Sequence, residues 1–500
     1  MARRISILFA LLLALNLVPG LAGADVNVDK SDNVTQLAHL MQEGGATEVD
    51  YDGERYAYVG QWNGTTDTFD RRNVSASHPG GLWIIDLVGD EETEPLSVVG
   101  KLPCPGTDNY VRYMNPEVFN TEEGDREFVA MAHHGNFCSR ITLRNDPNTV
   151  PSYGAYNGVS IVDVTDKANP TIASVIGHYS AHTVMPHPTR PYLYILPGGL
   201  ANGTETNKPV VSPTGIVDVS DPYNPRYVQA FQHNATGCHD LGFTPDGNHA
   251  YCAGLAEVQV WDVSGDNIES PQVVNTITNP AIQFPHNAVV SDDGKYMLIN
   301  DEAFGFHTCR DDAADLYGSL WIYDISIPNL PVLAGRIAPP AIESEMNVAD
   351  WVASWCAAHN YNFVPGTHIV VASWFAGGMT AHDISNPLEP VKLAHYMPDG
   401  GVAWSAHYYG GYVLTGDMAR GVEILDVPDL REAEEAAKGD DEEPTGENGT
   451  TALSSSSLAP RVDVSELLIP DVLPPRPPRP AASMDKEGGF CVIPGGFKVA

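Results

Sequence analysis

Two residue types that bind metals, histidine and glutamate, recur at one position of a repeated sequence pattern. Histidine begins a predicted strand in five copies of the pattern, and glutamate takes that position in two others. Imidazole and carboxylate groups together suit divalent transition metals such as Zn, Cu, Fe, Mn or Ni, and they can also activate water or transfer protons. The residues predicted to bind a metal are therefore His182, His239, His286, His359, His407, Glu117 and Glu48.

The pattern that aligns these residues is an apolar strand that ends in an aspartate and a turn. Its clearest copies are Gly158 to Asp166 (GVSIVDVTD) and Gly215 to Pro222 (GIVDVSDP). Further copies surround Asp262, Asp324, Asp383, Asp426 and Asp86. Seven copies of one phrase indicate a repeat protein, and the aspartate is expected to accept hydrogen bonds from backbone N–H groups of the turn.

Each repeat is predicted to contain four antiparallel strands. In the repeat from Cys238 to Ile277 they are His239 to Thr244, Asn248 to Ala253, Glu257 to Val263 and Pro271 to Ile277. No window shows sustained helical periodicity, so the chain is predicted to be all-β. Seven such repeats predict a seven-bladed β-propeller over residues 33–427, with the histidine and glutamate positions around one mouth of its channel.

The N-terminal part of the propeller is expected to close the ring. The last repeat lacks an outer strand, and residues 37–45 match residues 393–401, which form an outer strand and its exit loop. Residues near 33 to 41 should therefore supply the missing strand and remove two exposed strand edges. After Val427 the chain is acidic and rich in serine and proline, so residues 428–500 are predicted to be a mostly disordered tail.

The repeated phrase also resembles that of a known family. The pattern G-x-x-I/V-V-D-V-S-D-P-x-x-P is similar to the LVIVD-repeat family of secreted β-propellers, over about residues 46 to 427. The resemblance is strong at Asp163 and Asp218 and weaker at Asp86, Asp262 and Asp426. It implies the fold and export, and it implies no activity because the family has none firmly assigned.

The first residues of the chain have the features of a secretory signal. Arg3 and Arg4 precede an apolar core, and a small-residue cleavage site follows, so residues 1–24 are predicted to be a signal peptide. An uncleaved signal anchor is the rival interpretation. No later apolar run is long enough to span a bilayer, so we expect a secreted, extracellular or cell-surface-associated protein. Six N-glycosylation triplets agree with export and begin at Asn33, Asn63, Asn73, Asn202, Asn234 and Asn448.

Charge and cysteine content narrow the partners and the compartment. A net charge of −37 argues against nucleic acid and anionic membranes as partners, because phosphates and lipid head groups would be repelled. Seven cysteines fit an oxidising compartment. We predict the disulfides Cys238–Cys252, Cys104–Cys138 and Cys309–Cys356, with Cys491 unpaired. The competing interpretation places His307, Cys309, Cys356 and His359 around a soft metal ion.

Two functions are compatible with these observations. The first is a monomeric, secreted binding or interaction module that holds an extracellular protein, a glycan, a small molecule or a metal ion. The alternative is a metal-dependent extracellular oxidoreductase or hydrolase that uses the same channel mouth. Each histidine could instead hydrogen-bond the backbone of the neighbouring blade and merely hold the ring together. Long loops are expected over this mouth, and the residues in or beside them are His133, His134, Asp301, Glu302, His307 and Trp355.

Overall fold

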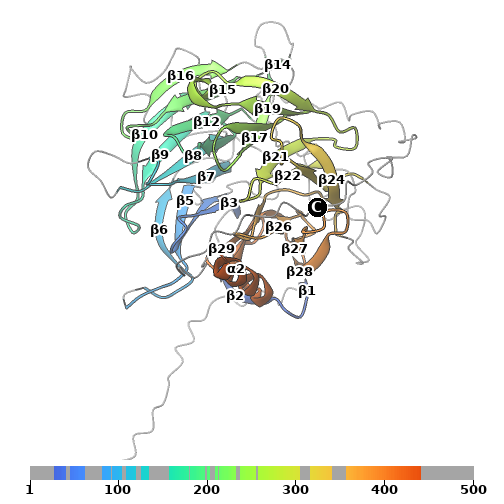
Figure 1. The fold of residues 1–500 in the computed structure, drawn as a ribbon. Coiled ribbons are helices and arrows are strands. Elements are labelled where there is room, and N and C mark those ends of the chain that lie inside the picture. Colours follow the sequence, from blue (N-terminus) through green and yellow to red (C-terminus); the bar gives the residue numbers. More distant parts are fainter. Residues whose placement is uncertain are drawn as a thin grey trace, which may run out of the picture.

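Seven antiparallel β-sheets surround a central axis in the computed structural model of this protein (Figure 1). This arrangement confirms the predicted all-β, seven-bladed propeller. The structure describes residues 28–440 with the exception of 41–44, 62–80, 92, 104–107, 120–125, 135–156, 179–180, 198–199, 203–208, 212, 232–236, 255–256, 304–315 and 341–355. The predicted signal peptide, residues 441–500 of the predicted tail and most of the predicted long loops lie outside the described residues.

The blades follow the chain, and the first strands of most neighbouring blades contact one another around the axis. Blade one consists of β3 (Ala46–Tyr51), β4 (Tyr56–Gln61), β5 (Gly81–Asp86) and β6 (Ser97–Pro103), and blade two of β7 (Asp108–Met114), β8 (Phe128–His134), β9 (Asn157–Asp163) and β10 (Thr171–His178). Blade three consists of β11 (Thr183–Pro186), β12 (Tyr192–Leu196), β15 (Thr214–Asp218) and β16 (Arg226–Phe231). Blade four consists of β17 (Cys238–Phe243), β18 (His249–Gly254), β19 (Val258–Asp262) and β20 (Gln272–Ile277). Blade five consists of β21 (Pro285–Val290), β22 (Tyr296–Asp301), β23 (Leu320–Asp324) and β24 (Val332–Ile337). Blade six consists of β25 (Tyr361–Phe363), β26 (Ile369–Ser373), β27 (Met379–Asp383) and β28 (Val391–Pro398). Blade seven consists of β29 (Ala403–Tyr409), β30 (Tyr412–Asp417), β31 (Gly421–Asp426) and β2 (Thr35–Leu40). Three short elements join them: the hairpin β13 (Leu200–Asn202) and β14 (Pro209–Val211), and the 3-10 helix η1 (Gly265–Ile268).

The apolar core lies between neighbouring blades, and the third strand of each blade contributes to both sides. In β23, Trp321 and Tyr323 pack into the cluster shared with blade four, whereas Leu320 and Ile322 pack into the cluster shared with blade six. Alternate side chains of a strand point to opposite faces of its sheet, and both faces of a blade are covered. This explains why the repeated phrase is continuously apolar rather than alternating.

Strand β2 closes the ring, as the sequence predicts. It pairs antiparallel with β31, from Thr35 opposite Asp426 to Leu40 opposite Val422, and so supplies the outer strand of blade seven. The preceding strand β1 (Val28–Lys30) pairs with β28 and extends blade six to five strands. The N-terminal strands thus join the last two blades and leave the seventh sheet complete.

The prediction of disorder directly after residue 427 is wrong for the first part of that segment. Residues Pro428–Asp440 form helix α2, which begins where β31 ends. Leu430 is fully buried in a cluster with Val34 of the closing segment, and Tyr408 Oη donates a hydrogen bond to Glu434 Oε2 (2.8 Å). A single buried leucine in an acidic stretch is a weak sequence signal, and packing against the ring supplies the missing stability. Within the described part of the chain, no helix has the length and apolarity needed to cross a membrane.

The aspartate at the end of the repeated phrase has the predicted structural role. Its Oδ1 accepts the backbone N–H two residues later at Asp163, Asp218 and Asp262, with distances of 3.0, 3.0 and 2.9 Å. The same contact recurs at Asp324 and Asp383. These carboxylates therefore fix the turn that follows the third strand, and none of them faces the histidine mouth.

The cysteines that can be placed agree with an oxidising compartment. Cys238 and Cys252 form a disulfide across the β17–β18 hairpin, as predicted. Cys356 is also disulfide-bonded, and because its sulfur is engaged it is not a ligand of the alternative soft-metal site. Its predicted partner Cys309, together with Cys104, Cys138 and Cys491, lies outside the described residues.

Candidate metal centre

Local irregularities in the inner strands direct side chains into the channel mouth. The pairing of β17 with β18 shifts by one residue at His239, and that of β29 with β30 shifts at Trp404. The pairing of β21 with β22 is irregular over His286 and Asn287. Such bulges bend a strand locally and change the direction of one side chain. His239, His286 and Trp404 therefore occupy equivalent places in three blades.

Four of the predicted histidines form a continuous arc of buried rings around this mouth. The ring centroids are 4.4 Å apart between His182 and His239, 4.3 Å between His239 and His286, and 4.1 Å between His286 and His359. Trp404 continues the arc at 4.3 Å from His359. The structure thus brings together His182, His239, His286 and His359, and it places a tryptophan where the sequence alignment put His407.

His407 and Glu48 lie in a second layer, deeper in the channel. His407 is three residues beyond Trp404 in β29, and its Nδ1 donates to the backbone oxygen of Val49 (2.8 Å). Its Nε2 lies 3.7 Å from Glu48 Oε1. Both side chains are buried, and neither belongs to the histidine arc in which the sequence placed them.

The predicted position of Glu117 is wrong. Glu117 is exposed in the loop after β7, where its backbone N–H donates to Asn115 Oδ1. The inner strand of blade two is β7 itself, which places Tyr110 and Arg112 in the channel. The available signal was an arginine within the otherwise apolar and aromatic run Tyr110 to Met114, and the absence of a histidine in this repeat removed the usual marker.

His239, His286 and Glu302 form the group best suited to hold a metal ion. One ligand atom from each lies within 4.8 Å of the other two, and all three side chains are buried. His286 Nε2 is 3.9 Å from Glu302 Oε2. Sequence analysis placed Glu302 beside the mouth but missed it as a ligand, because it follows the second strand of a blade rather than beginning the first.

The neighbouring Asp301 fixes the position of Glu302. The Asp301 carboxylate accepts four backbone N–H groups, from Gln283, Phe284, Ala303 and Gly318, at 2.9 to 3.1 Å. The backbone N–H of Glu302 donates to the oxygen of Phe284 (3.1 Å), and Ala303 adopts a left-handed conformation with φ of 52°. Such strained positions persist only where the surroundings hold them, which here directs Glu302 at the histidines.

Hydrogen bonds also fix the tautomers of two of these histidines, His239 and His359. His239 Nδ1 lies 3.2 Å from the backbone oxygen of His286, and His359 Nδ1 lies 2.6 Å from that of Trp404. A carbonyl oxygen can only accept, so Nδ1 carries the proton and Nε2 keeps its lone pair. This is the arrangement in which protein histidines bind metals. The histidines therefore join neighbouring blades, as the structural interpretation holds, and also present Nε2 as a ligand atom.

Burial keeps the cluster uncharged. Burial, together with the nearby rings of His359, His239 and His182, holds the pKa of His286 well below its usual value. Burial lowers the pKa of His359 to about 3. Burial and the neighbouring Asp301 raise the pKa of Glu302 to about 8. Neutral imidazoles are ready metal ligands, and a bound cation would draw the proton from Glu302.

A network of polar side chains forms the floor beneath the histidines. Arg112 of blade two forms an ion pair with Glu48 of blade one and donates to Tyr110, whose hydroxyl donates to Asp240 of blade four (2.9 Å). Asn360 of blade six donates to the other Glu48 oxygen. The Tyr110–Asp240 and Asn360–Glu48 contacts join blades that are not neighbours, so these side chains meet across the axis. Charged and polar side chains from several blades therefore meet on the axis beneath the histidines.

Aromatic rings pack against two of the histidines. Phe284 stands edge-on to His239 at 5.0 Å, and Phe375 lies 4.6 Å from His359. Phe375 and Trp404 belong to an apolar cluster with Ala303. Apolar surroundings lower the local dielectric constant and strengthen the attraction between a cation and a carboxylate.

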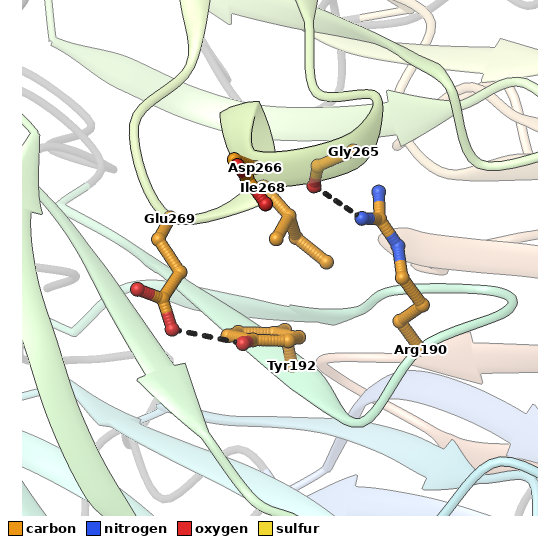
Figure 2. Close-up of a pocket in the computed structure, with 6 residues that line it drawn as sticks. All are labelled: Arg190, Tyr192, Gly265, Asp266, Ile268 and Glu269. Carbon is orange, nitrogen blue, oxygen red and sulfur yellow. Dashed lines mark hydrogen bonds between the residues drawn. The ribbon is translucent and has the colours of Figure 1, made fainter.

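A separate hollow of about 370 Å³ lies between the β11–β12 turn and η1 (Figure 2). Its polar groups contact one another: Tyr192 Oη donates to Glu269 Oε1 (2.9 Å), and Arg190 Nη1 donates to the backbone oxygen of Gly265 (2.7 Å). Arg190 also donates to the oxygen of Val263. These bonds join blades three and four, so we assign the hollow a structural role.

Comparison with known proteins leaves the activity open. No family model matches the sequence, and no curated protein matches it. Among solved structures, the chain is similar to the β-propeller domain of Myceliophteria thermophila Cps50 (Swd1), with 10% sequence identity and a TM-score of 0.47. The match covers 78% of this chain and 98% of that chain. Similarity at this level carries no argument about function, so the function must be inferred from the site itself.

Proposed function

We propose that this protein is an exported β-propeller that binds a divalent transition-metal ion through His239, His286 and Glu302. The observation that carries this proposal is the convergence of three ligand atoms, from three buried side chains, within 4.8 Å of one another. Two imidazoles and one carboxylate form a ligand set that Zn, Fe, Mn and Cu all accept. The burial of these side chains and the aromatic rings of Phe284 and Phe375 against the neighbouring histidines favour a binding module.

Buried polar atoms without hydrogen-bond partners support a metal-binding role for this group. Among the described residues, neither ring nitrogen of His286 has a hydrogen-bond partner, although the side chain is buried. A buried polar atom without a partner costs about 1–3 kcal/mol, so native structures rarely keep one without a functional reason. A metal ion bound to one nitrogen of His286 would remove the part of this cost that belongs to that atom.

Export and the choice of partner are further parts of the proposal. The predicted signal peptide and the disulfide between Cys238 and Cys252 support an extracellular or cell-surface location. The similarity of the repeats to the LVIVD family supports the same location, and we propose that the chain is a distant member. The histidine mouth is then the face at which an extracellular protein, a glycan or a small molecule binds.

Metal analysis of the purified protein tests the site. After incubation with zinc and removal of free ions, we expect about one zinc per chain in the parent protein. The double variant His286→Ala/Glu302→Gln should retain less than about a tenth of that amount, because it loses two of three ligands. The control His407→Gln, in the same channel but outside the triad, should retain the metal. A folded parent protein without stoichiometric zinc, copper, iron or manganese would exclude the proposed site.

A further inference from the structure

We infer that His359 is the fourth protein ligand of this metal ion, so that the ion is enclosed by three imidazoles and one carboxylate. The inference rests on the proposed metal site and goes beyond the triad of His239, His286 and Glu302. Its consequence is functional, because four protein ligands complete the coordination sphere of a tetrahedral ion such as Zn²⁺. The site would then retain its metal without an open position for a substrate.

The first argument is the geometry of His359. Its ring lies 4.1 Å from that of His286, the shortest spacing in the arc, and its side chain is fully buried. Nδ1 donates to Trp404, and within the described residues Nε2 has no hydrogen-bond partner. His359 therefore has an Nε2 lone pair without a hydrogen bond in a ring that lies beside His286. Its ligand atom lies outside the group within 4.8 Å, so the ring must turn towards the ion to bind it.

The second argument is a side chain that fixes His286 and His359 relative to each other. Asn300 Oδ1 accepts the backbone N–H of Asn287 (2.7 Å), next to His286. Its Nδ2 donates to the backbone oxygens of Ala358 (2.8 Å) and His359 (3.1 Å). One buried amide thus connects the two histidine-bearing segments across the boundary between blades five and six. This is the role that residues outside the coordination sphere play in metal sites.

The third argument comes from a comparison with His407. Like His359, it hydrogen-bonds a backbone oxygen of the neighbouring blade through Nδ1, but it does not lie beside the triad. Its Nδ1 also donates to a neighbouring blade, but its Nε2 faces Glu48, which already pairs with Arg112. The ring of His359 faces His286 instead. The shared backbone contact explains why both histidines hold the ring together, and only the surroundings of Nε2 distinguish a ligand from a structural residue.

Cobalt(II) is a suitable probe, because its visible absorption is intense in four-coordinate sites and weak in six-coordinate ones. The parent protein loaded with cobalt should show intense bands that added azide does not change. His359→Ala should show weaker bands that respond to azide, and added imidazole should restore the intensity. His182→Ala, which removes the arc member on the other side of His239, should keep the parent spectrum. Asn300→Ala should retain the bands but bind cobalt about 10- to 100-fold more weakly.

The results separate the inference from the proposed function. If parent and His359→Ala give the same azide-sensitive spectrum, His359 is not a ligand, although the triad still binds metal. If the parent binds no cobalt, the metal site itself is wrong. Should His359→Ala fail to fold, His359→Gln retains a donor for the Trp404 oxygen, and the same spectral change is expected of it. An unchanged spectrum in folded His359→Gln would overturn the inference.

Discussion

The buried carboxylate of Glu48 connects several blades at the centre of the propeller. Glu48 is fully buried, and its partners come from three other blades: Arg112, Asn360 and His407. A buried carboxylate is tolerated only when its charge is compensated and its oxygens are hydrogen-bonded. The stability of the floor therefore depends on Arg112 more than on the apolar contacts around it.

Replacing Arg112 with methionine should leave the Glu48 charge uncompensated. We expect Arg112→Met to reduce the free energy of unfolding by about 3–5 kcal/mol, measured by urea denaturation, because one partner of a buried pair is lost. The double variant Arg112→Met/Glu48→Gln should recover most of this loss. Arg226→Met, which breaks exposed pairs with Asp218 and Glu269, should cost less than about 1 kcal/mol. Equal losses in Arg112→Met and in the double variant would contradict this account.

His187, in the β11–β12 turn, should make the protein sensitive to acid. Its Nε2 donates to the oxygen of Gly247 (2.8 Å), its Nδ1 accepts the N–H of Thr189 (3.2 Å), and burial lowers the pKa of the ring to about 4. The unfolded chain, with a histidine pKa of about 6.5, binds more protons between these values. Stability present above pH 6.5 is therefore lost as the pH falls towards 4, by roughly 2–3 kcal/mol.

The variant His187→Gln tests this pH dependence. Glutamine can donate to Gly247 and accept from Thr189, but it does not titrate. We expect urea unfolding midpoints at pH 7.5 and 4.5 to differ less in the variant than in the parent. The same difference in both proteins would show that other groups cause the acid sensitivity.

At the level of secondary structure, the sequence predicted the strands and their order correctly where one pattern is repeated. Aligning the repeats identified the strands, the closing role of residues near 33 to 41 and the arc from His182 to His359. The alignment of the repeats selected the wrong residues where a repeat departs from the pattern. The repeat of β7 has no histidine, so the alignment selected Glu117 instead of Tyr110 and Arg112. Glu302 was missed as a candidate ligand because the residue after the second strand is not repeated: it is Glu302 after Asp301 in blade five and Met418 after Asp417 in blade seven.

Helix α2 was missed for a different reason. Helix formation here depends on a contact that the local sequence does not contain, between Leu430 and residues of blades six and seven. The ring also holds the helix through the Arg431–Asp426 ion pair and the hydrogen bond from Asn33 Nδ2 to Asp429 (2.7 Å). The helix therefore joins the end of the propeller to its closing N-terminal segment.

Leu430 should therefore contribute to the stability of the whole ring. We expect Leu430→Ala to lower the free energy of unfolding by about 2–5 kcal/mol, because a fully buried leucine leaves a cavity. The matched control is Leu388→Ala, at a turn residue that is 46% exposed, and it should change stability by less than about 0.5 kcal/mol. Chemical denaturation of both variants gives the comparison. Similar small effects in both would mean that α2 is not coupled to the ring.

The whole molecule carries a large excess of negative charge, which should make its stability depend on salt. The chain has 64 acidic and 27 basic residues, for a net charge of −37. Salt weakens both repulsion and attraction, but exposed attractive pairs such as Arg226–Asp218 contribute less than about 1 kcal/mol each, and acidic residues greatly outnumber basic ones. Screening of repulsion should therefore dominate. Raising NaCl from about 0.05 to 1 M shortens the screening length to about 3 Å, and we expect the thermal midpoint of the metal-free protein to rise by at least about 4 °C. Choline chloride at equal ionic strength should have the same effect and sucrose at equal osmolality a smaller one, because screening requires ions but no particular cation. A midpoint that falls with salt would mean that attractive pairs outweigh the net charge.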